Sequence, residues 1–86
     1  MLYATKCYWP GVTRDDLEQV AGRAAGSDGV VYLGSLLFAA DDLVLCMFQG
    51  HSRAAVIRAS DQLGIPRERL MDSLWIGRDT LKGSES

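Results

Sequence analysis

An α+β domain is predicted by the order of the segments along the chain. Strand-like segments at residues 2–9, 30–48 and 70–76 alternate with helical segments at residues 13–26 and 52–64. The segment 30–48 is long enough for two strands that fold over a short acidic turn. The resulting order, strand–helix–strand–strand–helix–strand, is that of the split βαβ pattern. We therefore expect a ferredoxin-like βαββαβ fold, with a four-stranded antiparallel sheet and both helices on one face.

The first strand and the first helix are marked by their ends. Residues 2–9, LYATKCYW, are rich in aromatic and small residues, and the Pro-Gly pair at 10–11 ends the strand. Thr13 is a good N-cap, and Asp16 three residues later suits a capping box. The apolar positions that follow recur at helical spacing and are Leu17, Val20, Ala21 and Ala24. Gly26 is expected to end this helix.

The second helix is predicted to start at Ser52, its N-cap. Its apolar stripe is Val56, Ala59 and Leu63. Gly64 is expected to end the helix, and Pro66 prevents it from resuming. The last strand is expected at residues 70–76, LMDSLWI.

The segment 30–48 is apolar at nearly every position, which is unusual for a small antiparallel sheet with one face in water. Strand alternation predicts one face formed by Val31, Leu33, Leu37 and Ala39. It predicts an opposite face formed by Val30, Tyr32, Leu36 and Phe38. Two helices cover only one face of the sheet. Because monomers tolerate only small exposed apolar patches, we expect a second copy of the chain to cover the other face, as a homodimer.

Length and charge restrict the function further. The chain has 86 residues, enough for one domain at 1–77 and a polar tail at 78–86. Its net charge is −2 and it lacks a basic stripe, which argues against nucleic acid as a partner. The apolar runs are too short for a membrane helix, and the N-terminus does not resemble a signal peptide. We expect a cytoplasmic protein that does not act at a membrane.

The chain resembles the DUF4242 family of small bacterial proteins, which includes a nickel-binding member with a ferredoxin-like fold. The resemblance spans residues 3–76 and is carried by the segments YWPGVTRDDLEQVAGRA and YLGSLLFAADDLVLCMFQGHSRAAVIRASDQLGIPRERL. Its most telling parts are the Pro-Gly turn at 10–11, the Cys-Met-Phe strand end at 46–48, and the Gly-Ile-Pro sequence at 64–66. The resemblance implies the same fold, and metal binding as one activity.

The ligands of such a metal site differ from those of histidine-bearing family members. Those members have HDLPG where this chain has CYWPG at 7–11, and they carry helix histidines where this chain has Ile57 and Asp61. Cys7, Cys46 and His51 are the candidate ligands that remain, and thiolate and imidazole suit nickel or zinc. Cysteine is among the most buried residue types, so we interpret both cysteines first as small core residues, with metal ligation as the alternative.

Several further side chains are candidates for lining a ligand pocket. They are Lys6, Tyr8, Trp9, Tyr32, His51, Asp72 and Trp75. Three functions are compatible with them. The first is a non-catalytic homodimer that binds a metal ion or a small apolar molecule. The second is a cofactor-free monooxygenase, isomerase or cyclase with a pocket between sheet and helices. The third is a structural or regulatory subunit.

Overall fold

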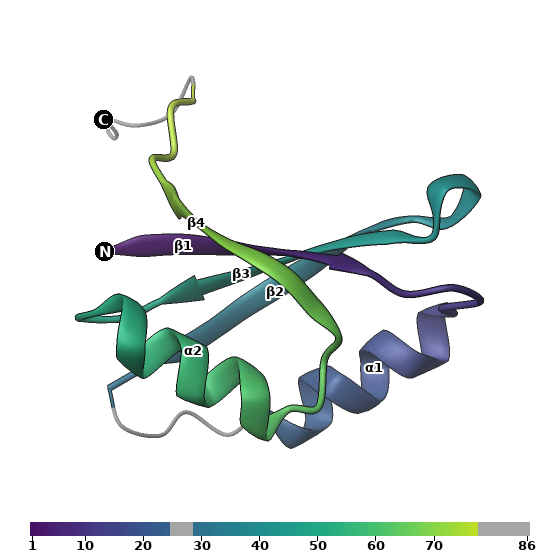
Figure 1. Ribbon diagram of the computed structural model, residues 1–86, viewed down its shortest axis with the longest axis horizontal. Helices are drawn as coiled ribbons and strands as arrows, with labels where there is room; N and C mark the ends of the chain where they lie inside the picture. The colour runs from purple at the N-terminus through teal and green to yellow at the C-terminus, as the bar shows by residue number, and fades with distance from the viewer. Residues whose placement is uncertain (25–28, 78–86) are drawn as a thin grey trace.

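The computed structural model describes residues 1–24 and 29–77 and confirms the predicted order of elements (Figure 1). The elements are β1 (Leu2–Tyr8), α1 (Arg14–Arg23), β2 (Val31–Phe38), a 3-10 turn (Ala39–Asp41), β3 (Leu43–Gln49), α2 (Arg53–Gln62) and β4 (Arg67–Ser73).

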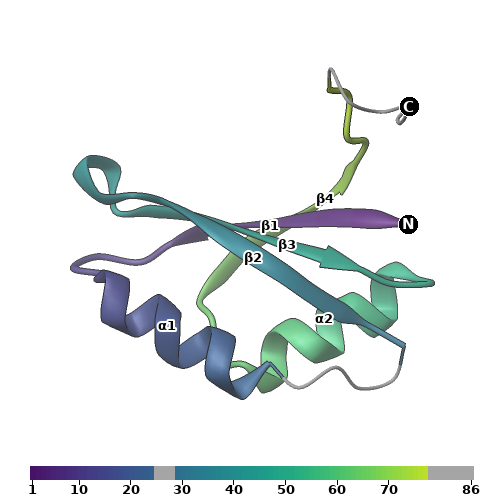
Figure 2. The ribbon, with the colours of Figure 1, turned by 180° about the vertical axis from the view of Figure 1, so that it is seen from behind.

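All neighbouring strands of the sheet run antiparallel, in the order β2-β3-β1-β4. The first and third strands lie in the middle, as the crossover rule predicts. Both helices lie on the same face, and the opposite face is not covered by either of them (Figures 1 and 2). The fold is the ferredoxin-like α+β fold. None of the helices in the described part of the chain is long and apolar enough to cross a membrane.

The helix ends follow the predicted caps. The Thr13 side chain accepts a hydrogen bond from the Asp16 amide, and the Asp16 carboxylate accepts one from the Thr13 amide at 2.8 Å. Ser52 caps α2 by accepting a hydrogen bond from the Ala55 amide at 3.1 Å. Gly64 follows α2 with a φ of 72°, a left-handed conformation that favours glycine. The predicted stop at Gly26 lies outside the described residues.

The core lies between the helices and the inner face of the sheet. The central strands contribute alternate residues to it, which are Tyr3, Thr5 and Cys7 from β1 and Val44, Cys46 and Phe48 from β3. Val20 of α1 and Val56 of α2 are fully buried against them. The stripe predicted for α2 therefore faces the sheet, as do Leu17, Val20 and Ala24 of α1, whereas Ala21 of the predicted α1 stripe is exposed.

The last strand lies earlier in the chain than predicted, at Arg67–Ser73 and not at residues 70–76. Its neighbour β1 begins at Leu2, which pairs with Ser73. Within residues 1–24 and 29–77, no strand extends beyond Ser73 for residues 74–76 to pair with. These apolar residues therefore continue past the sheet, on the side away from the helices (Figures 1 and 2).

The face assignment predicted for β2 is wrong because the strand contains a bulge. Tyr32 pairs with Phe48, but Gly34 pairs with Met47, so Leu33 is an extra residue without a partner across the strand. The bulge reverses the alternation after Leu33. The outer face of β2 consequently carries Val31, Leu33, Leu36 and Phe38, which are all exposed. Tyr32, Ser35 and Leu37 face the helices.

Candidate functional site

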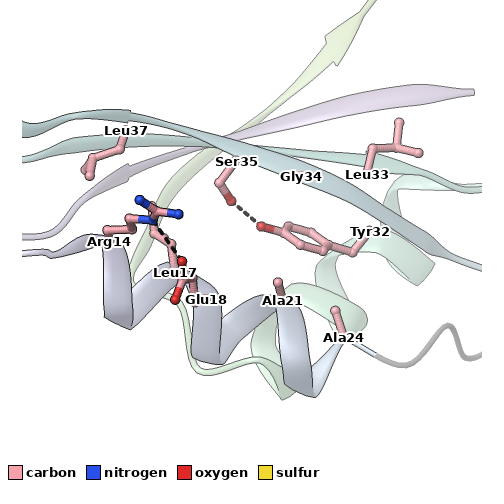
Figure 3. A pocket seen from close by; sticks show the side chains of 10 residues that line it. All are labelled: Arg14, Leu17, Glu18, Ala21, Ala24, Tyr32, Leu33, Gly34, Ser35 and Leu37. Atoms are coloured by element: carbon pink, nitrogen blue, oxygen red, sulfur yellow. Dashed lines mark hydrogen bonds and ion pairs between the residues drawn. The ribbon is translucent and has the colours of Figure 1, made fainter.

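A groove of about 560 Å³ lies between α1 and the edge strand β2 (Figure 3). This volume falls within the range of small-molecule sites, about 300–1,000 Å³. Helix α1 contributes Arg14, Leu17, Glu18 and Ala21 to its walls, followed by Ala24, and β2 contributes Tyr32, Leu33, Gly34, Ser35 and Leu37. Most of the wall is apolar, and the polar groups are restricted to a few positions.

The bulge in β2 brings two hydroxyl groups together in this groove. In a regular strand, residues three apart point to opposite faces. The extra residue Leu33 places Tyr32 and Ser35 on the same face, and their hydroxyl groups lie 2.5 Å apart. Gly34 at the bulge has a φ of 144°, which a residue with a side chain rarely adopts. In Figure 3 the Tyr32 ring lies beneath β2 and points toward Ser35, whereas Leu33 points away from α1.

A chain of hydrogen bonds leads from the groove to the core. The Ser35 hydroxyl donates to the Cys46 sulfur at 3.1 Å. Since a serine hydroxyl carries one proton, the Tyr32 hydroxyl must donate to the Ser35 oxygen. Burial raises the pKa of Tyr32, so its hydroxyl keeps the proton that this bond requires. The Tyr32 oxygen thus retains lone pairs that can accept a further hydrogen bond.

The two cysteines lie together in the core, where the hydrogen bonds that lead inward from Tyr32 and Ser35 end. Both thiols are fully buried, on adjacent strands β1 and β3. A hydrogen bond to Cys46, followed by burial, raises the pKa of Cys7. The same bond, together with those donated by Ser35 and Thr5, lowers the pKa of Cys46 to about 7 against the opposing effect of burial. Cys46 is therefore the acceptor on which the surrounding donors converge.

The three candidate metal ligands do not form one site. Cys7 and Cys46 are neighbours, but His51 is exposed and its ring lies near Gly29. Cys46 lies within β3, whereas His51 lies beyond the end of this strand, just before α2. Among the described residues, no three side chains of the His, Cys, Asp and Glu types lie close enough together to hold a metal ion.

The other pocket candidates are scattered, and only Tyr32 lines the groove. Lys6 lies on the outer face of the sheet, 3.9 Å from Glu68. Asp72 lies at the edge of the sheet and accepts a 2.5 Å hydrogen bond from Arg53 of α2. The remaining candidates do not line the groove: Tyr8 is exposed, Trp9 packs against the core, His51 is exposed and Trp75 lies beyond β4.

Sequence reasoning missed Ser35 and the α1 side of the groove. Ser35 looks like an ordinary turn or strand residue until the bulge is known. The only signal was Gly34, because an isolated glycine within an apolar strand is typical of a bulge. Arg14 and Glu18, which form a 2.8 Å ion pair at the groove, could be placed on α1 by their spacing but not assigned to a site.

Comparison with known proteins supports the fold. No family model matches the chain, and no curated protein matches it. Among solved structures, it is similar to SCO4226 from Streptomyces coelicolor A3(2), with a TM-score of 0.78 and 17% sequence identity. The match covers 90% of this chain and 100% of that chain. At this identity the likeness establishes the shared ferredoxin-like fold alone.

Proposed function

We propose that this protein is a small homodimeric binding protein that takes an apolar molecule into the groove between α1 and β2, without catalysing a reaction. The observation that carries the proposal is the pair of hydrogen bonds that run from Tyr32 to Ser35 and from Ser35 to Cys46, at a wall of the groove that is otherwise mostly apolar. Ligand sites typically combine such a wall with a few polar groups that orient the ligand.

The direction of the hydrogen bonds from Tyr32 to Ser35 to Cys46 determines which polar group a ligand needs. Because Tyr32 gives its proton to Ser35, its oxygen offers only acceptor lone pairs to the groove. A ligand that carries a hydroxyl or N–H donor can satisfy this oxygen. A molecule without a donor leaves it unpaired, and we expect such a molecule to bind more weakly.

The homodimer is supported by the outer face of the sheet. Val31, Leu33, Leu36 and Phe38 are 41–57% exposed along one strand of a single chain. Leu43, Leu45 and Met47 of β3 extend the same apolar surface and are only half-buried. Covering this surface with the same surface of a second copy removes a continuous apolar area from water.

The groove is tested with 1-naphthol, an apolar molecule with one hydroxyl donor, compared with naphthalene, which has none. Binding is followed by the amide chemical shifts of α1 and β2. We expect 1-naphthol to bind more tightly than naphthalene. Tyr32→Phe should weaken the binding of 1-naphthol about fivefold, which corresponds to the loss of about one hydrogen bond. Equal affinities for the two molecules would contradict the role of the Tyr32 oxygen.

A groove-filling variant and a matched control outside the groove test where 1-naphthol binds. Ala21→Phe places a large ring in the groove, and we expect it to weaken 1-naphthol at least tenfold. Ala54→Phe makes the same exchange at an exposed position of α2 outside the groove, and it should leave the affinity unchanged. If Ala21→Phe binds 1-naphthol as well as the unsubstituted protein does, the groove is not the binding site.

A further inference from the structure

The end of the groove near the start of α1 holds an ion pair that uses only part of its hydrogen-bonding capacity. The Nε of Arg14 donates to one carboxylate oxygen of Glu18 at 2.8 Å. Within residues 1–24 and 29–77, the two Nη groups of Arg14 and the second oxygen of Glu18 make no other hydrogen bond or ion pair. In Figure 3 the guanidinium reaches from α1 toward β2. Donors and acceptors of this pair are thus open to a ligand in the groove.

The two charges together select the charge of the ligand's head group. An anion that binds Arg14 lies beside the carboxylate of Glu18, which repels it, and a cation that binds Glu18 lies beside the guanidinium. A zwitterion avoids both repulsions, because its carboxylate faces Arg14 and its cationic group faces Glu18. A guanidinium also suits a carboxylate geometrically, since two parallel N–H groups can bind its two oxygens.

The short distance within the ion pair restricts the ligand further. The Arg14 nitrogen and the Glu18 oxygen lie 2.8 Å apart, so the two charges of the ligand must also lie close together. An α-amino acid meets this requirement because its ammonium and carboxylate groups are attached to the same carbon. Within a peptide these two groups are converted to amides, so the arrangement favours a free amino acid.

The position of the pair on α1 gives this ligand an orientation. Arg14 is the first residue of α1, where the helix dipole also favours a carboxylate. Glu18 lies one turn further along the helix. The groove then continues to Ala21 and Ala24, which lie opposite Tyr32 (Figure 3). The side chain of the amino acid therefore points away from the start of α1 and toward Tyr32.

This part of the groove suits an aromatic side chain with one hydrogen-bond donor. Leu17, Ala21 and the ring of Tyr32 present apolar surface to it. Ala21 follows Glu18 by three residues, about 4.5 Å along the helix axis, and an aromatic side chain spans such a distance. The Tyr32 oxygen accepts a hydrogen bond, because its own proton is donated to Ser35. The indole N–H of tryptophan is a donor of the required kind.

We infer that the groove binds a free aromatic α-amino acid, with its carboxylate on Arg14, its ammonium group on Glu18 and its ring beside Tyr32. The inference rests on the proposed function, since it uses the same groove and the same Tyr32 oxygen. It adds the chemical class of the ligand.

Three indole compounds test the head group. They are L-tryptophan, indole-3-propionate, which lacks the ammonium group, and tryptamine, which lacks the carboxylate. Binding is followed by the amide chemical shifts of α1 and β2. We expect L-tryptophan to bind at least fivefold more tightly than either of the others, because only L-tryptophan pairs with both charges.

Charge-removing variants give a readout that a loss of folding cannot imitate. Glu18→Gln should weaken L-tryptophan about fivefold but strengthen indole-3-propionate, because the like charge beside its carboxylate is gone. Arg14→Gln should weaken L-tryptophan and strengthen tryptamine for the corresponding reason. The matched control is Arg58→Gln, which removes an exposed arginine of α2 outside the groove and should leave the affinity for L-tryptophan unchanged.

The ring donor is tested separately with 1-methyl-L-tryptophan, in which a methyl group replaces the indole proton. We expect it to bind about fivefold more weakly than L-tryptophan, the difference that one hydrogen bond makes. In Tyr32→Phe the two compounds should bind equally. A preference for L-tryptophan that persists in Tyr32→Phe would contradict the placement of its ring.

The outcomes separate this inference from the proposed function. Equal affinities for the three indole compounds would overturn it, and so would weaker binding of both L-tryptophan and indole-3-propionate to Glu18→Gln. If 1-naphthol binds in a manner that depends on Tyr32 and L-tryptophan does not bind, the amino-acid ligand is wrong but the groove remains a binding site. If neither compound binds, both the inference and the proposed function are wrong.

Discussion

At the scale of single residues, Cys46 is where the donors of the inner core converge. Its sulfur accepts from Ser35 at 3.1 Å, and the hydrogen bond from Cys7 lowers its pKa to about 7. Cys7 keeps its proton because the same bond and its burial raise its pKa. The pKa values of the two thiols are thus shifted in opposite directions, although both are buried core residues.

This difference predicts a pH-dependent stability. The pKa of Cys46 is below its ordinary value of 9.0, so its contribution to the free energy of unfolding is present above pH 9 and is lost as the pH falls through about 7. The raised pKa of Cys7 acts oppositely, and its contribution is lost as the pH rises above 9.0. Relative to Cys46→Ala, the protein should gain stability from pH 7 to 9 and lose it above pH 9.

Two measurements check the prediction. Urea unfolding gives the free-energy difference between the protein and Cys46→Ala at each pH. Thiolate absorbance in the ultraviolet reports ionisation of the folded pair directly, and it should appear near pH 7 in the protein but not in Cys46→Ala. Absorbance that appears only above pH 9 would show that the donors do not lower the pKa of Cys46.

At the scale of elements, the bulged strand β2 builds both surfaces to which we assign function. On its inner side the bulge places Tyr32 and Ser35 together, and on its outer side it places the exposed apolar residues in one row. Gly34 permits this because its φ of 144° carries no side-chain strain.

Alanine substitution at two glycines tests the role of the bulge. Gly34→Ala should lower the free energy of unfolding by about 1–3 kcal/mol, the cost of an unfavourable backbone region. Gly22→Ala within α1 is the control, and it should raise stability by about 0.5–1 kcal/mol because alanine is the better helix former. Chemical denaturation of both variants gives the comparison. Equal effects would show that the bulge does not depend on glycine.

The same element shows how far the sequence predicts the structure. Caps at Thr13 and Ser52 follow from local patterns that act over a few residues. The order of strands and the covered face follow from the order of the elements and the handedness of their crossovers. The faces of β2 do not, because one extra residue reverses the alternation and its position depends on pairing with β3. The shift of β4 likewise depends on where β1 begins. The groove follows from the bulge and could not be predicted without it.

At the scale of the whole molecule, the distribution of apolar surface is one-sided. The helices bury the inner face of the sheet, while the apolar residues of the outer face of β2 remain exposed in a single chain. A second copy of the chain would cover this face. We therefore propose that the protein associates as a homodimer through the outer face of the sheet.

Sedimentation equilibrium of the unsubstituted protein and of Leu36→Asp tests this claim most directly. Leu36 is 57% exposed in the single chain, so the aspartate does not disrupt the core of a monomer, but it would be buried at the interface. We predict a dimer for the unsubstituted protein and for the control Ala54→Asp on α2, and a folded monomer for Leu36→Asp. A monomer for the unsubstituted protein at every concentration, or a dimer for Leu36→Asp with unchanged affinity, would contradict the account.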